Sequence, residues 1–405
     1  MMNVERVRSS FPILSKKING STLVYFDNSA TTHKPVQVID SVSQFYCQWN
    51  SNIHRGIHYL SEKATEMYES SRESVREFIG AENSSEIIFT RGTTEAINMV
   101  ATCFGAVNVS EGDEIIISEM EHHSNLVPWQ VLCKQKKATL KVIPITDNGI
   151  LRADLLLSLI TQKTKLIAIT MVSNVLGTVN PVNAIIKTAH SFNIPVVLDA
   201  AQCIQHTKID VKELDCDFVA FSGHKMYAQT GIGVLYGKKK WLDTISAYQY
   251  GGGMISSVDL FSTEFCSPPN KFEAGTPNIS GALSLKAAID FLNDIGLNSI
   301  EQHEKNLMEY ATQKLMELEH ITIYGPQTNR TGALSFNIDG ISSYDVAALL
   351  DRMAIAVRSG THCAQPLMKR LGIKNCIRAS FALYNTNQEI DLFIQGIKRV
   401  LNLLT

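Results

Sequence analysis

The sequence lacks the features that mark several special classes of protein. Basic and acidic residues nearly balance, with 37 Lys and Arg against 39 Asp and Glu and a net charge of −2. This balance argues against nucleic acid or an anionic membrane surface as a partner. No apolar run approaches the roughly 20 residues that a membrane-spanning helix needs. Glycine (24) and proline (11) are not enriched among the 405 residues, which excludes collagen-like and linker-rich proteins. The remaining composition, 45% hydrophobic and 19% charged, predicts a globular chain of two or three domains.

The cysteines also lack a pattern. None forms a Cys-x-x-Cys pair and their spacings are irregular, so the sequence predicts no metal site and no disulfide scaffold. The first residues lack the apolar core of a signal peptide. Unpaired thiols in a chain of this length fit a reducing compartment, and we expect a cytoplasmic enzyme. The eight are Cys47, Cys103, Cys133, Cys203, Cys216, Cys266, Cys363 and Cys376.

Short apolar runs alternate with helical patterns through the middle of the chain. Continuous runs of this kind are typical of strands buried on both faces, as in a parallel sheet covered by helices. Residues 181–192 are one of the helical segments between them. The alternation predicts an α/β domain. The runs are residues 86–90, 114–118, 166–172, 196–199 and 218–222.

The last third of the chain has a different pattern. Residues 334–338 alternate apolar and polar side chains, as in a strand with one solvent-exposed face. Capping-box pairs, Ser342 with Asp345 and Thr386 with Glu389, predict the starts of two helices. A near-continuously apolar helix at about 282–292 is expected to join a large α/β domain to this smaller α+β domain.

Three of the predicted strands are followed by residues that suit a ligand site. In parallel sheets, ligands bind beyond the carboxyl ends of the strands. Gly92-Thr93-Thr94 after the first run can open a helix whose N-terminus receives a phosphate, although a threonine there also serves as an ordinary helix cap. Asp199 ends another run, where it either meets a ligand or caps the next helix. Lys225 follows a third run, where burial would turn it into a nucleophilic amine unless it extends to solvent.

Together these three features are stronger evidence for a ligand site than any one of them alone. Pyridoxal 5′-phosphate needs a lysine that forms a Schiff base, an acidic partner for its pyridinium nitrogen and a phosphate site. The residues after the three strands supply all of them, so the pattern predicts this cofactor.

The chain resembles the cysteine desulfurases of the class V aminotransferase group, specifically the second, SufS-like group. The resemblance covers essentially the whole chain through seven ordered motifs. It implies the type I fold of pyridoxal-phosphate-dependent transferases, with a mainly parallel seven-stranded sheet covered by helices. It implies a large cofactor-binding domain at 20–290 and a small α+β domain from 1–19 and 291–405. The motifs are residues 52–56, 91–95, 121–125, 199–202, 222–225, 273–277 and 358–363.

The resemblance also implies roles for the cofactor-binding residues. Lys225 corresponds to the lysine that binds the cofactor covalently, and Asp199 to the partner of the pyridinium nitrogen. Gln202 corresponds to the residue that binds the ring hydroxyl. His122 corresponds to the imidazole stacked on the ring, although from the sequence alone the adjacent His123 could take that place. The phosphate ligands implied are Thr93, Thr94, Ser222, His224 and, from the other subunit of a homodimer, Thr276.

On the substrate side, the resemblance assigns the carboxylate of L-cysteine to Arg378, which suits the bidentate fork of a guanidinium. Asn174, Arg358 and His54 correspond to further substrate-side residues. Cys363 corresponds to the nucleophile that accepts the sulfur.

Cys363 also differs from the other cysteines in its own surroundings. The small and polar residues before it predict an exposed, mobile loop, and the nearby Arg358 and His362 would favour its thiolate form. Cys203 and Cys216 adjoin apolar strands and are expected to be inert core thiols.

The predicted reaction is conversion of L-cysteine to L-alanine, with the sulfur held as a persulfide on Cys363. The family hands this sulfur to SufE- or SufU-type acceptors for iron–sulfur cluster assembly, and residues 251–269 correspond to a hairpin beside the cysteine loop. A selenocysteine lyase and a class V aminotransferase remain alternatives at this point. A non-catalytic scaffold is disfavoured because Lys225, Asp199 and Cys363 are all present. A Cys-His hydrolase is disfavoured because no Asn or Asp partner adjoins His362.

Overall fold

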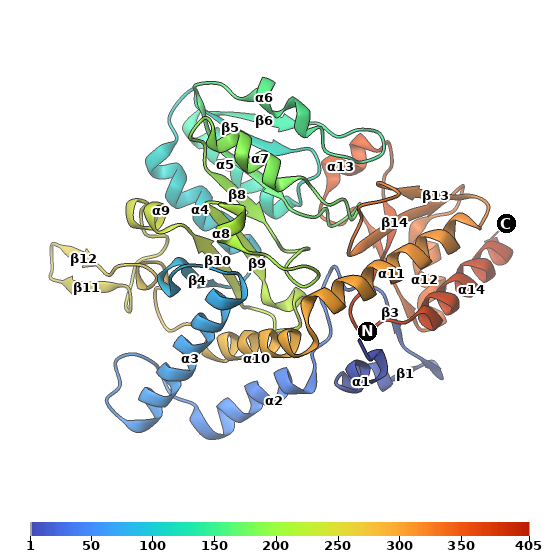
Figure 1. The fold of residues 1–405 in the computed structure, drawn as a ribbon, viewed down its shortest axis with the longest axis horizontal. Coiled ribbons are helices and arrows are strands. Elements are labelled where there is room, and N and C mark those ends of the chain that lie inside the picture. Colours follow the sequence, from blue (N-terminus) through green and yellow to red (C-terminus); the bar gives the residue numbers. More distant parts are fainter. Residues whose placement is uncertain (1, 405) are drawn as a thin grey trace.

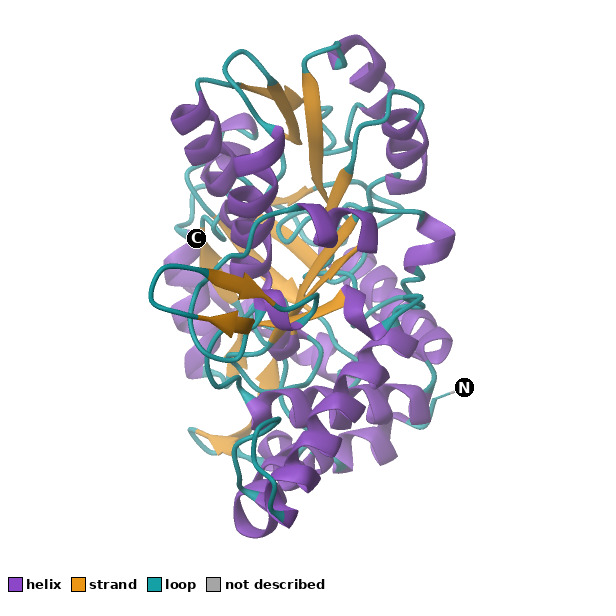
Figure 2. Ribbon diagram, turned by 90° about the vertical axis from the view of Figure 1, so that its left-hand side faces the viewer, coloured by secondary structure: helices purple, strands orange, loops and turns teal. Residues whose placement is uncertain are grey.

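The computed structural model describes residues 2–404. Its centre is a seven-stranded sheet with helices on both faces, and a smaller sheet covered by α11, α12 and α14 lies beside it (Figures 1 and 2). This arrangement confirms the predicted α/β class. The helices are α1 (Val4–Ser9), α2 (Val36–Gln44), α3 (Tyr59–Phe78), α4 (Thr93–Asn108), α5 (Val127–Lys136), α6 (Leu156–Leu159), α7 (Val182–His190), α8 (Val211–Leu214), α9 (Lys239–Thr244), α10 (Ile279–Ile295), α11 (Leu297–Met316), α12 (Ser343–Arg352), α13 (Gln365–Arg370) and α14 (Asn387–Leu404).

The central sheet is mainly parallel. Only β10 runs antiparallel, and it does so to both of its neighbours. All five predicted runs form strands of this sheet, although the third ends at Thr170 instead of residue 172. The spatial order is β4 (Ile87–Thr90), β10 (Gly233–Gly237), β9 (Phe218–Ser222), β8 (Val196–Asp199), β7 (Thr164–Thr170), β5 (Glu114–Ser118) and β6 (Thr139–Ile143).

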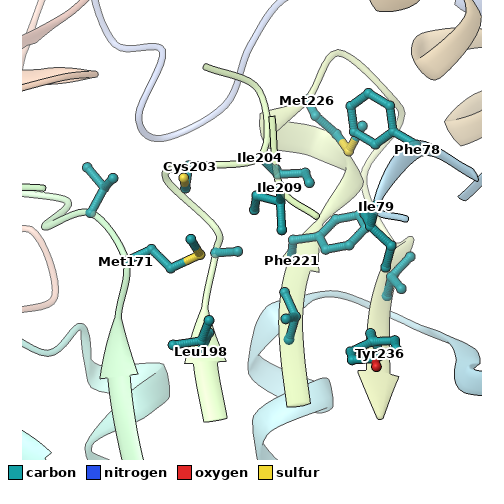
Figure 3. Packing of buried hydrophobic residues seen from close by; sticks show 14 of the residues in the cluster. Phe78, Ile79, Met171, Leu198, Cys203, Ile204, Ile209, Phe221, Met226 and Tyr236 are labelled. Atoms are coloured by element: carbon teal, nitrogen blue, oxygen red, sulfur yellow. The ribbon is translucent and has the colours of Figure 1, made fainter. Parts of the chain in front are cut away.

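Side chains on the two faces of the sheet enter two separate apolar clusters. Within β8, for example, Val196 and Leu198 pack on the side of α3, α7 and α10, while Val197 packs on the side of α4 and α5. Figure 3 shows part of the first cluster, with Leu198 and Phe221 projecting from neighbouring strands. Burial on both faces explains why these strands have continuous apolar sequences.

The C-terminal part contains a four-stranded antiparallel sheet in the order β13 (Ile321–Tyr324), β14 (Ala333–Ile338), β17 (Cys376–Ser380) and β16 (Arg358–Gly360). Its core also receives Val24 and Phe26, because β3 (Val24–Tyr25) pairs in parallel with β15 (Ile355–Ala356). Near-N-terminal residues thus belong to the packing of this sheet. The predicted domain limits at 20 and 290 stay a prediction.

Two short hairpins complete the strands: β1 (Lys17–Ile18) with β2 (Ser21–Thr22), and β11 (Ile255–Val258) with β12 (Thr263–Phe265). The second projects from the body of the molecule (Figure 1). At its tip, Leu260 and Phe261 are 92% and 97% exposed.

Both predicted helices begin directly after the expected residues, α12 after Ser342 and α14 after Thr386. Thr386 and Glu389 form the expected reciprocal pair, since Thr386 N donates to Glu389 Oε2 and Glu389 N donates to Thr386 Oγ1. Ser342 is the N-cap residue of α12, as the pattern predicted, but its side chain makes no capping hydrogen bond. The next residue, Ser343, instead bonds with Ser359 and Asn375. The expected helix at 282–292 lies within α10, which meets α11 at Gly296.

Among residues 2–404, none of the helices combines the length and the apolar character needed to cross a membrane. In the same range, no group of three or more His, Cys, Asp and Glu side chains is arranged to hold a metal ion.

Candidate active site

A cavity of about 270 Å³ lies beyond the carboxyl ends of the central strands. It brings together twelve of the fourteen site residues predicted from the sequence. Thr276 and His54 do not line it: Thr276 is exposed, and His54 lies beside Glu69 and Tyr68. The lining residues are Ser29, Ala30, Thr93, Thr94, His122, Ser124, Thr170, Asn174, Asp199, Ala201, Gln202, Ser222, His224, Lys225, Arg358, His362, Cys363 and Arg378.

One end of the cavity is formed by the N-terminus of α4. Gly92, with φ of +154°, takes a backbone conformation that side chains disfavour and leads directly into Thr93. Thr93 donates its backbone N–H to Ser222 Oγ at 2.8 Å, and its hydroxyl lies 2.7 Å from the same atom. The first turn of α4 and the end of β9 therefore form one hydroxyl-rich wall. Such a wall at a helix N-terminus suits an anion.

Lys225 lies in the single turn Gly223–Lys225 that follows β9. Burial lowers the pKa of its amine to about 8, against the opposing effect of Asp199, and Arg378 lowers the pKa further. The amine faces the cavity rather than bulk solvent, so the snorkelling alternative does not describe it. A lysine in this state has a substantial neutral, nucleophilic fraction near neutral pH.

Asp199 and Gln202 form the floor of the cavity. Asp199 ends β8, is 3% exposed, and accepts the N–H of Ala201 at 2.9 Å. Burial raises the pKa of Asp199, while the nearby Lys225 lowers it. Gln202 donates to Ser29 O at 2.8 Å, and its Oε1 is buried without a partner among the described residues. This orphaned acceptor is ready for a donor from a bound molecule.

The two adjacent histidines have different contacts. His122 lines the cavity and accepts the Ser124 N–H at Nδ1 (3.1 Å), and burial lowers its pKa to about 3. It is therefore neutral, with its proton on Nε2. His123 instead holds the cysteine loop, because its N–H donates to Cys363 O at 2.8 Å and its Nε2 accepts from Gln365 N at 3.2 Å. The geometry favours His122 as the residue that faces a ligand.

Cys363 is exposed at the cavity mouth, as the sequence predicted. It and His362 both have left-handed backbones, with φ of 54° and 51°, so the turn directs successive side chains differently. His362 points inward and its Nε2 lies 3.0 Å from Cys376 O. Burial lowers the pKa of His362 to about 3. The expectation that His362 supplies positive charge to the thiol is therefore wrong, because a neutral imidazole supplies none.

Two arginines share one carboxylate at the other side of the cavity. Arg358 donates from Nε to both oxygens of Asp27 at 3.0 Å, and Arg378 donates from Nη2 to Oδ1 at 3.2 Å. Arg378 is 3% exposed, and its Nη1 donates to Asn174 O at 2.9 Å while its Nε has no partner within residues 2–404. The two arginines carry two positive charges and Asp27 only one negative charge. A carboxylate of a ligand can balance the remaining positive charge.

Three contributors to the site carry no pattern that predicts a role: Asp27, the neighbouring segment 29–34, and Glu121. Glu121 is fully buried and accepts from Ser118 Oγ, Asn125 Nδ2 (2.6 Å) and Thr170 N (3.0 Å). Burial raises its pKa to about 8. It thus joins the ends of β5 and β7 to the loop of His122. The only available signal was its place next to His122 in a recognised motif.

Comparisons with known proteins agree with this geometry. A sequence model described as "Aminotransferase class-V" matches residues 24–393. A "probable cysteine desulfurase" of Halalkalibacterium halodurans is 51% identical over 398 residues, 98% of each chain. An apo cysteine desulfurase of Thermococcus onnurineus superposes with a TM-score of 0.95 at 40% identity, over 100% of this chain and 99% of that one. The Escherichia coli cysteine desulfurase CsdA, in an S-sulfonic acid form, gives 0.93 at 38% identity over the whole of both chains.

Proposed function

Because this chain belongs to the class-V aminotransferase family, we propose that it is a pyridoxal-phosphate-dependent cysteine desulfurase. The observation that carries the proposal is that one cavity is lined by Lys225, Asp199 and the exposed Cys363. The full-length similarity to cysteine desulfurases supports the same reaction.

The residues of the cavity fit pyridoxal 5′-phosphate. Thr93, Thr94, Ser222 and His224 would hold the phosphate, Asp199 the pyridinium nitrogen, and the unpartnered Oε1 of Gln202 the ring hydroxyl. His122, neutral and beside this wall, would lie against the ring. When bound through Lys225, the cofactor supplies an electron sink for the negative charge that develops at the substrate Cα.

The arginine pair would bind the substrate carboxylate. The unpartnered Nε of Arg378 and the exposed guanidinium of Arg358 offer donors next to Asn174. Fixing the carboxylate at this side directs the substrate Cα toward Lys225 and the substrate sulfur toward Cys363 at the mouth.

Lys225 and Cys363 would then divide the chemistry. The neutral amine of Lys225 accepts the proton from Cα. The Cys363 thiolate attacks the substrate sulfur: an S–S bond forms, the C–S bond breaks, and its electron pair remains with the carbon fragment. Protonation of that fragment gives L-alanine, and the sulfur stays as a persulfide on Cys363. Since the thiol is exposed, the persulfide is accessible to an acceptor protein.

We extend the proposal to partners. Thr276 is exposed, outside the cavity of its own chain, and the projecting hairpin carries the exposed Leu260 and Phe261. Both features suit a homodimer in which each subunit completes the phosphate site of the other. A SufE- or SufU-type acceptor, iron–sulfur cluster assembly as the destination of the sulfur, and a cytoplasmic location belong to the same proposal.

The test compares Cys363→Ala with Cys47→Ala, which removes the other exposed thiol. After treatment with L-cysteine, mass spectrometry should find one added sulfur atom on Cys363 in the parent and in Cys47→Ala. Cys363→Ala should keep the cofactor absorbance and lose both this adduct and alanine formation. Alanine release by Cys363→Ala at the parent rate would overturn the nucleophile. A requirement for a keto acid would indicate the aminotransferase, and faster turnover of L-selenocysteine than of L-cysteine the lyase.

Lys225→Ala provides the second arm. Borohydride reduction should fix the cofactor to Lys225 in the parent and to no residue in this variant. A covalent adduct at another lysine would show that the cofactor assignment is wrong.

A further inference from the structure

The backbone carbonyl of His224, directly before Lys225, is surrounded by hydrogen-bond donors from the segment Thr31–Lys34. Thr31 Oγ1 lies 3.0 Å from it and Thr32 Oγ1 lies 3.2 Å from it. Thr32 N lies 3.1 Å away and Lys34 Nζ 3.0 Å away. A carbonyl oxygen has two lone pairs, so four donors saturate it and fix the plane of the His224–Lys225 peptide.

The same segment holds the chain on the other side of Lys225. Thr32 Oγ1 accepts the N–H of Tyr227 at 2.9 Å. Lys225 itself lies in a single turn, Gly223–Lys225, with no long helix to orient it. The direction in which its side chain leaves the backbone therefore depends on contacts with Thr32 and Lys34, which are almost 200 positions away in the sequence.

Lys34 is the contributor that packing alone does not explain. Its amine is partly buried, donates to Thr32 O (2.5 Å) and His224 O (3.0 Å), and pairs with no carboxylate among the described residues. Burial lowers the pKa of Lys34 to about 7. A partly buried amine without an acidic partner is costly, whereas an apolar side chain would fill the space at no such cost. Both protonation states of the amine can donate to the carbonyl.

We propose that Lys34 is a positioning residue for Lys225, holding the His224–Lys225 peptide so that the Lys225 amine approaches the cofactor aldehyde in the orientation that forms the covalent bond. In that step the amine nitrogen bonds to the aldehyde carbon and the aldehyde oxygen leaves as water. The inference rests on the proposed function, since it concerns the lysine to which pyridoxal 5′-phosphate would attach.

The experiment separates orientation from affinity by using two ligands on the full-length apoprotein. The rate of covalent capture of pyridoxal 5′-phosphate is followed by borohydride trapping and mass spectrometry. Equilibrium binding of pyridoxine 5′-phosphate, which has no aldehyde, measures the non-covalent site. The variants are Lys34→Met and Lys34→Arg. Lys271→Met is the matched control, because Lys271 likewise donates to backbone carbonyls, of Leu242, Asp243 and Ile245, yet does not line the cavity.

The capture rate of Lys34→Met should fall about tenfold, the factor expected for one lost hydrogen bond from a charged donor. Its affinity for pyridoxine 5′-phosphate should change by less than about twofold, because Lys34 is not among the residues that line the cavity. Lys34→Arg should recover most of the rate, and Lys271→Met should behave as the parent.

Capture by Lys34→Met at the parent rate, or an equal loss of rate and of pyridoxine 5′-phosphate affinity, would overturn the inference. The second result would mean that Lys34 supports the whole site rather than the orientation of Lys225. If the parent itself failed to attach the cofactor at Lys225, the proposed function would fail first, so the two failures are distinguishable.

Discussion

The buried ion pair between Arg72 and Glu273 lies close in sequence to Thr276, the proposed contact with the other subunit, and its contribution to stability can be predicted. Glu273 lies three residues before Thr276 and accepts from four donors. Arg72 provides two of them, at 2.7 and 2.9 Å. Tyr68 Oη at 2.9 Å and Phe89 N at 2.7 Å provide the others. The Arg72 side chain is 1% exposed and that of Glu273 is 7% exposed.

Glu273→Gln removes the negative charge and turns an N–H₂ group toward these donors. Removing one partner of a buried pair costs about 3–5 kcal/mol. With about 2.1 cal/mol/K of unfolding entropy per residue, this corresponds to a fall of about 4–6 °C in melting temperature for a chain of this length. The loss should also loosen the segment that carries Thr276, and so weaken dimer formation.

Glu69→Gln is the internal control. Glu69 binds the same guanidinium, accepting from Arg72 Nε at 2.9 Å, but its side chain is 41% exposed. Exposed pairs contribute about 0.2–1 kcal/mol, so its melting temperature should fall by about 1 °C or less. Calorimetry of the holoenzymes at one protein concentration provides the comparison. Equal melting temperatures for the two variants would refute the reasoning that burial, and not the ion pair as such, sets the cost.

Two further predictions concern titratable groups. Glu121→Gln should gain stability relative to the parent as the pH rises from about 5 to about 8, because burial raises the pKa of Glu121 to about 8 and the folded parent in this range keeps a proton that its unfolded chain has released. Melting temperatures of both proteins across this range test the prediction, and a difference that does not change with pH would contradict it. Iodoacetamide should modify Cys363 and Cys47 of the native protein and spare Cys203 and Cys216, which are buried and whose thiol pKa values burial raises to about 12. Peptide mapping that found Cys203 or Cys216 modified before Cys363 would contradict this prediction.

The central sheet and its ligand edge were predictable because one physical rule governs both. Strands buried on both faces must be continuously apolar, and parallel strands place the residues after them at one edge. Thr93, Asp199 and Lys225 therefore meet in one cavity. The edge strand β6 was not predicted because its side chains are mixed in exposure, and β10 was not predicted because it begins and ends in glycine.

The other half of the site was not predictable from local pattern. Asp27 follows a strand of only two residues, and its partners Arg358 and Arg378 are 331 and 351 positions away. No periodicity signals a contact of that range. The orientation of His362 likewise depends on the carbonyl of Cys376, in another strand. The identity of Cys363 came from its motif, since Cys47 is also exposed.

The path of residues 24–34 has a consequence for biosynthesis. This stretch pairs with β15, holds the two arginines through Asp27, supports Gln202 through Ser29 and secures the peptide before Lys225. It leaves the ribosome early, whereas Arg358 and Arg378 emerge near the end of translation. The cofactor edge of the central sheet can form on the nascent chain, but the arginine pair that would bind the substrate can form only after the last strands are synthesised. A chain released before residue 358 would carry Lys225 and lack the means to hold a substrate against it.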